Sequence, residues 1–172
     1  MKLVIRSRCL QSTPYFYMRI YFTYSLNKEI EYALSCVDDY EKLRSAGYHV
    51  KIPNLKGKLS SDKQVNFQVK KEYNPKFFEN TLSGLVARWE KEENEFLKFI
   101  SGRKLKALGS YVCYLTRYGS GGSYNKPNEI YVRVVTKEDI VEFTETVKHE
   151  LLHLMLPSLS EREVEDMVTE SK

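Results

Sequence analysis

The chain has 172 residues, 42% of them hydrophobic and 13% aromatic, so it is long enough to bury a core and too rich in aromatic residues for a disordered protein. Its three cysteines lie far apart without a Cys-x-x-Cys pair, which argues against a disulfide framework and a thiolate zinc site. No apolar stretch reaches the length of a signal peptide core or a membrane span. We therefore expect a cytoplasmic protein without membrane contacts.

The net charge of +4 is distributed unevenly along the chain. Residues 1–76 contain 14 Lys or Arg against 7 Asp or Glu, residues 77–136 contain 9 against 6, and residues 137–172 contain 4 against 10. The basic first segment is suited to contact nucleic acid or an acidic protein, whereas the acidic last segment is suited to bind a cation.

Residues 1–74 alternate strand and helix patterns, which predicts an α/β region. Strands are expected over four segments: Leu3–Ile5, Tyr15–Tyr24, Tyr48–Val50 and Ser61–Tyr73. The last of these is predicted because Val65, Phe67 and Val69 alternate with polar residues. Apolar residues at helical spacing predict a helix over Leu26–Ser45 that is stopped by Gly47.

Residues 75–172 predict a second region that is mostly helical. Its expected elements are a helix over Phe77–Ile100, strands over Tyr111–Tyr118 and Glu129–Val135, a helix over Lys137–Leu156 capped by Thr136, and a helix over Glu161–Ser171. The glycine run Gly119–Ser123 lacks the Lys-Ser or Lys-Thr of a phosphate-binding loop, so it is predicted to be a flexible hairpin loop. The whole pattern predicts an α+β fold.

The pentapeptide His149-Glu150-Leu151-Leu152-His153 lies in the predicted helix Lys137–Leu156. Residues four apart share a helix face, so His149 and His153 can present their imidazoles to one metal ion. Glu150 lies on the flank, where its carboxylate can reach a water bound to that metal. This spacing is typical of helical zinc metallohydrolases, in which the glutamate is the general base. The alternative is a solvated helix that happens to carry two histidines.

A catalytic zinc site needs a third protein ligand. The remaining histidine, His49, lies far upstream, so a carboxylate of the last predicted helix is favoured. Glu161 is preferred because it points inward one turn before Val164, and Glu165 one turn later is the candidate for a supporting acceptor. The alternative for this cluster is an acidic helix start that is stabilised by the helix dipole.

These residues resemble a known family. Thr146–Met155 is similar to the active-site helix of zincin metallopeptidases, and Glu161–Val168 is similar to the glutamate helix of their gluzincin branch. The order of long helix, strand, edge strand Ile130–Val135 and active-site helix resembles the minigluzincins and the related repressor-cleaving peptidases. The resemblance covers roughly residues 75–170 and implies a small zincin-like half with a backing helix and a short mixed sheet.

By this resemblance Glu161 is a metal ligand, and Glu165 stands where the family has Asp or Asn. The implied activity is zinc-dependent hydrolysis of a peptide or protein substrate that pairs with the edge strand. A donor for the developing oxyanion is also needed, and the candidates are Tyr124, Tyr131 and Arg133.

Two alternatives remain open from the sequence. In one, a catalytically silent zincin scaffold serves as a binding or regulatory module whose basic N-terminal half contacts protein or nucleic acid. In the other, residues 1–74 form strands that occupy the substrate groove of a latent enzyme.

Overall fold

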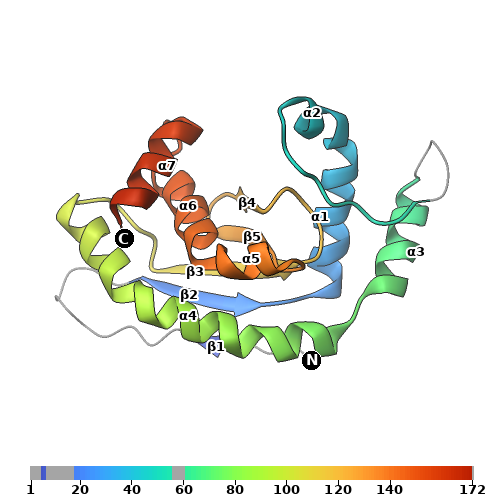
Figure 1. Cartoon of the computed structure of the whole chain (residues 1–172), viewed down its shortest axis with the longest axis horizontal. Coiled ribbons are helices and arrows are strands. Elements are labelled where there is room, and N and C mark those ends of the chain that lie inside the picture. Colours follow the sequence, from blue (N-terminus) through green and yellow to red (C-terminus); the bar gives the residue numbers. More distant parts are fainter. Residues whose placement is uncertain (1–4, 7–17, 56–60, 172) are drawn as a thin grey trace.

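A computed structural model describes residues 5–6, 18–55 and 61–171 of the chain (Figure 1). Within these residues the fold is α+β, with seven helices and a mixed sheet in the order β1-β2-β3-β5-β4. The strands are β1 (Ile5–Arg6), β2 (Arg19–Thr23), β3 (Ser110–Thr116), β4 (Gly122–Asn125) and β5 (Glu129–Arg133). The three central strands β2, β3 and β5 are parallel, and β1 and β4 pair antiparallel at the two edges. The predicted α+β class and mixed sheet are confirmed.

Helices cover both faces of the sheet. The main core joins one face to three helices: α4 (Pro75–Gly102), α6 (Phe143–Met155) and α7 (Glu161–Glu170). The other face carries α1 (Leu26–Asp38), whose Tyr32 ring stacks on Tyr131 of β5 at 4.6 Å between centroids. Helix α3 (Asp62–Glu72) packs on the outer side of α1 through a smaller apolar cluster. Two short helices, α2 (Tyr40–Ser45) and α5 (Lys137–Val141), complete the set within the described residues.

The predicted regions 1–74 and 75–172 both contribute to the sheet and to the main core. Strand β2 lies beside β3 along its whole length, and Ile20 and Phe22 are fully buried in the main core. Phe22 contacts Trp89 of α4 and Phe143 of α6, with ring centroids 6.2 and 5.7 Å apart. The main core therefore contains residues from both sides of residue 74.

The predicted strand Ser61–Tyr73 is wrong, because these residues form helix α3. Val65 and Val69, four apart, are buried against α1, while Phe67 between them is 68% exposed. Ser61 and Gln64 form a capping box that starts the helix. Of the three alternating apolar residues, Val65 and Val69 thus belong to a helical stripe, and Phe67 is an exposed aromatic residue.

The hairpin predicted at Gly119–Ser123 is also wrong, because β3 and β5 are parallel neighbours. Instead, Gly122–Asn125 forms β4, which lies antiparallel to β5 at the sheet edge. The predicted edge strand Ile130–Val135 is therefore an inner strand. Strand β4 is short and polar, so its pairing depends on backbone hydrogen bonds to β5. No pattern of side chains in the sequence predicts such a strand.

Three other predictions differ from the structure. The helix predicted over Leu26–Ser45 is divided at Asp39 into α1 and α2. The helix predicted over Lys137–Leu156 is divided at Glu142 into α5 and α6, and the Ile140 carbonyl at this break accepts a hydrogen bond from Arg88 of α4. The strand predicted at Tyr48–Val50 does not form; only Lys51, beside it, makes an isolated bridge with Gly119. The strands predicted at Leu3–Ile5 and Tyr15–Tyr24 lie partly outside the described residues, and within these β1 and β2 form.

Across the described residues, none of the helices combines the length and the apolar character that crossing a membrane requires.

The helical assignment of residues 62–72 makes a direct prediction. Val69→Ala should lower the free energy of unfolding by about 2 kcal/mol, because it removes buried methyl groups. Phe67→Ala should change it by less than about 0.5 kcal/mol, because the ring is exposed. Urea denaturation of both variants measures the difference. Equal destabilisation by the two substitutions would indicate a strand that buries both side chains.

Candidate metal centre

Helices α6 and α7 form the candidate site, and a five-residue connection, residues 156–160, joins them. Ser160 caps α7: its backbone N–H and its hydroxyl donate to Glu163 Oε2 at 2.8 and 2.7 Å. Glu163 is therefore held at the cap, and Glu161 is left in the first turn on the side that faces α6. Burial of Val164 and Val168 fixes this rotation of α7.

The structure brings His149, His153 and Glu161 together. Their ligand atoms all lie within 4.8 Å of one another. His149 Nε2 is 3.0 Å from both His153 Nε2 and Glu161 Oε2, and His153 Nε2 is 3.3 Å from Glu161 Oε1. The imidazole rings meet at 67° with centroids 4.7 Å apart. Two nitrogens and one carboxylate thus converge on one point from two helices.

This donor set fits zinc. In a tetrahedral site with metal–ligand bonds of about 2.0–2.1 Å, ligand atoms lie about 3.3 Å apart. The observed separations of 3.0–3.3 Å are close to that edge length without any rearrangement of the helices. Burial and the neighbouring His153 lower the pKa of His149, which favours the neutral imidazole that a metal binds.

Glu150 lies beside this group but beneath strand β4. Its side chain is buried, and burial together with the charge of Glu161 raises its pKa to about 8. Gly122 of β4 packs directly on it: a Cβ at this position would lie 2.9 Å from Glu150 Cδ and 2.7 Å from Thr146 Cγ2. The absence of a side chain at residue 122 therefore makes room for the carboxylate.

The three candidate oxyanion donors lie in different places. Tyr124 of β4 stacks on His153, with ring centroids 5.2 Å apart, and so lies at the site. Tyr131 lies on the opposite face of the sheet, where its hydroxyl donates to Glu129 Oε2 at 3.1 Å. Arg133 donates to Asp139 and to the carbonyls of His49 and Gly119. Of the three, only Tyr124 is positioned near the two histidines.

Glu165 acts on the site through its charge. It opposes the lowering of the pKa of His149, after the larger effects of burial, His153 and Glu161. Within the described residues its side chain makes no hydrogen bond to either imidazole. His49, the third histidine, lies outside the group and contributes its carbonyl to Arg133 Nη1 at 3.0 Å.

A buried lysine precedes the first histidine and was not identified from the sequence. Lys148 is 1% exposed, and its Nζ donates to Glu92 Oε2 of α4 at 2.7 Å, while Thr144 donates to Glu92 Oε1 at 2.9 Å. These contacts fix the rotation of α6 relative to α4. The sequence could have indicated this burial, because Lys148 shares the helix face of Leu151 and Leu152. A charged residue on such an apolar face needs a partner. Gly122 carried no comparable signal beyond its glycine-rich context.

Comparisons of the chain with protein-family models, with curated proteins and with solved structures found no match. The chemistry of the site therefore rests on the geometry of its own residues.

The contact between Gly122 and Glu150 is testable. Gly122→Ala should lower the free energy of unfolding by about 1–3 kcal/mol, because its methyl group overlaps a buried side chain. In the Glu150→Ala background the same substitution should be less destabilising, since part of the overlap is removed. A double-mutant cycle by thermal denaturation measures this coupling. Additive effects would show that the two residues do not contact one another.

The ion pair between Arg133 and Asp139 predicts a pH dependence of stability. Burial alone would raise the pKa of Asp139, but hydrogen bonds from Arg133 and from the backbone of Thr136 and Val135 lower it below its usual 3.8. Asp139→Asn should therefore destabilise the protein by about 3–5 kcal/mol at pH 7. A carboxyl group whose pKa is lower in the folded than in the unfolded protein stabilises the fold at pH values above its unfolded pKa. This stabilisation is lost as the pH falls through the pKa of the group in the folded protein.

The difference between wild type and Asp139→Asn should accordingly shrink below pH 3.8. Urea denaturation over a pH series measures it. Glu138→Gln, the neighbouring exposed residue, is the matched control and should change little. A difference that stays constant down to the acid limit contradicts the assignment.

Proposed function

We propose that this protein is a zinc-dependent peptidase in which His149, His153 and Glu161 hold the metal and Glu150 is the general base. The observation that carries the proposal is the convergence of three ligand atoms, separated by 3.0–3.3 Å, with a buried carboxylate on the adjacent helix position. The resemblance of these two helices to the active-site and glutamate helices of gluzincins supports the same assignment, including its minigluzincin-like architecture.

When bound, zinc would lower the pKa of water and polarise the scissile carbonyl. Glu150 accepts the proton of the attacking water and returns it to the leaving amine. Its buried position excludes bulk water from that transfer, and a cation at the histidines would favour its charged form. Tyr124, stacked on His153, is the candidate hydrogen-bond donor to the oxyanion.

Strand β4 offers a surface for an extended substrate. It is the edge strand on the side of α6, and its outer backbone groups are not paired within the described part of the sheet. A peptide that adds to this edge would run beside Gly122 and Tyr124, next to Glu150 and His153. The substrate we propose is therefore an extended segment of a peptide or protein.

The position of β2 bears on the latent-enzyme alternative. Strand β2 is separated from β4 by β3 and β5, and its side chains are part of the core. Removal of residues 1–74 would take away this strand and expose the core, so loss of folding is the expected result of such a truncation.

Metal analysis of the purified protein tests the proposal. Wild type should contain about one zinc per chain. His149→Ala, His153→Ala and Glu161→Ala should lose it because each removes a ligand, whereas Glu150→Gln should retain zinc and abolish peptide hydrolysis. The control is Asp166→Ala, which changes an exposed acidic residue of α7, the helix that carries Glu161. This variant should keep both zinc and activity.

Stability gives a readout that does not depend on finding a substrate. At free zinc of about 100 times Kd, the free energy of unfolding of wild type should rise by about 2.7 kcal/mol, and a chelator should reverse the rise. The three ligand variants should not respond. A wild-type protein that neither contains nor responds to zinc would falsify the proposed function.

A further inference from the structure

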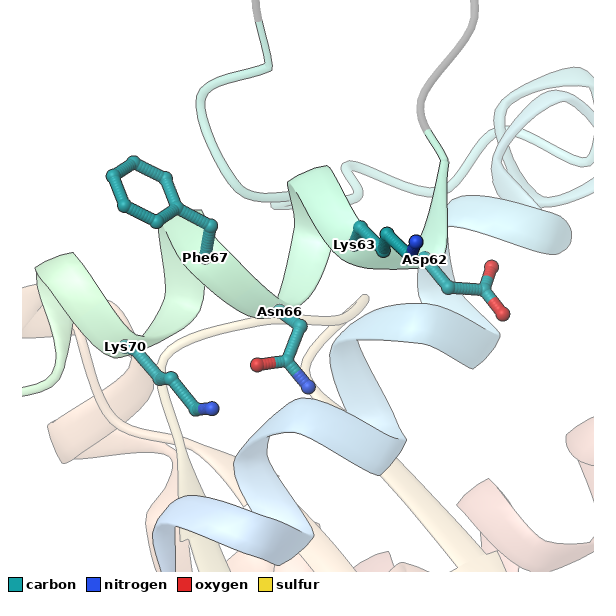
Figure 2. A pocket seen from close by; sticks show the side chains of 5 residues that line it. All are labelled: Asp62, Lys63, Asn66, Phe67 and Lys70. Atoms are coloured by element: carbon teal, nitrogen blue, oxygen red, sulfur yellow. The ribbon is translucent and has the colours of Figure 1, made fainter.

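Helix α3 presents an unusual aromatic surface. The Phe67 side chain projects from α3 and is 68% exposed (Figure 2). Val65 and Val69 hold the opposite side of the helix against α1, so the ring cannot turn inward without unpacking the helix. A largely exposed phenylalanine on a well-packed helix leaves apolar area in contact with water, and a ligand could cover that area.

Three lysines lie one helical turn from Phe67. Lys63, Lys70 and Lys71 lie four residues before and three and four residues after Phe67, so all of them share its side of α3. All three are exposed, and in the described part of the chain none forms a salt bridge with a carboxylate. In the sequence, residues 51–76 contain seven lysines against Asp62 and Glu72. The surface is therefore suited to a polyanion.

The surface is hollowed on both flanks of the ring. One hollow, of about 330 Å³, is lined by Asp62, Lys63, Asn66, Phe67 and Lys70 (Figure 2). The second, of about 480 Å³, is lined by Asn54, Leu55, Lys63, Gln64, Phe67, Gln68 and Lys71. Phe67 and Lys63 border both, so a planar group can approach the ring from either flank with a cation beside it.

We infer that this α3 surface binds single-stranded nucleic acid, with a base stacked on Phe67 and backbone phosphates at Lys63, Lys70 and Lys71. An aromatic platform with flanking cations is the arrangement by which proteins bind single strands without base-specific contacts. The chemistry favours nucleic acid over an acidic peptide because the ring protrudes and is open on both flanks. An acidic peptide supplies carboxylates for the lysines but no planar face for the ring, whereas a nucleotide supplies both a phosphate and a base that can stack on Phe67.

The site is separate from the candidate metal centre. Helix α3 lies at one end of the long axis of the molecule and α7 lies in the opposite half (Figure 1). Binding at α3 therefore requires neither zinc nor an intact His149 and His153, and the two proposals can fail independently.

Fluorescence anisotropy with a labelled oligo-dT of about 12 nucleotides tests the inference on the full chain. Wild type should bind with a slope of log affinity against log salt of about −2, as expected for three phosphate contacts to a single strand. Phe67→Ala should weaken binding about 5- to 150-fold with an unchanged salt slope. The triple variant Lys63→Gln, Lys70→Gln, Lys71→Gln should lose most of the salt dependence.

Matched controls use exposed residues elsewhere. Tyr48→Ala removes another exposed aromatic ring, and the triple variant Lys91→Gln, Lys106→Gln, Lys137→Gln removes the same charge; both should bind like wild type. Equal weakening by the two triple variants would overturn the inference, because it would show a general attraction to positive charge. Absence of binding at low salt, or equal binding of poly-glutamate, would also overturn it. Circular dichroism of each variant verifies that the fold is retained.

Discussion

Burial of helix α6 against the sheet and α4 determines where the two histidines point. Val147, Leu151 and Leu152 are fully buried, and Lys148 is held by Glu92. With one side of the helix fixed in this way, its 3.6-residue period directs His149 and His153 toward α7 and Glu150 toward β4. A rotation of α6 that separated the histidines from Glu161 would have to expose apolar side chains and unpair a buried lysine.

The remaining parts of the site depend on this orientation. The capping box of α7 holds Glu163 at the helix start and leaves Glu161 facing the histidines. Strand β4 approaches α6 closely because Gly122 has no side chain, and Tyr124 of the same strand covers His153. Helix α7 is positioned by its cap and by the burial of Val164 and Val168, and β4 is positioned by its backbone pairing with β5. The donor group is thus preorganised by elements that are themselves firmly packed.

The uneven charge of the sequence corresponds to two separate surfaces. The acidic C-terminal residues include Glu161 of α7, beside the two histidines, where negative charge favours a bound cation. The lysines of α3 lie at one end of the molecule, beside Phe67. The mixed sheet and its core lie between them. One chain can therefore present a cation site and a polyanion surface without either charge neutralising the other.

The sequence by itself determined the α+β class, most helices and the His149, Glu150, His153 spacing, because these depend on local periodicity and capping. It also favoured Glu161, since helical rotation follows from Val164 and Val168. The tertiary structure alone decided that residues 62–72 are helical, that Gly122–Asn125 is the edge strand, and that Tyr124 rather than Tyr131 lies at the histidines. These features depend on which surfaces pack together and which backbone groups pair, and such contacts link residues far apart in sequence.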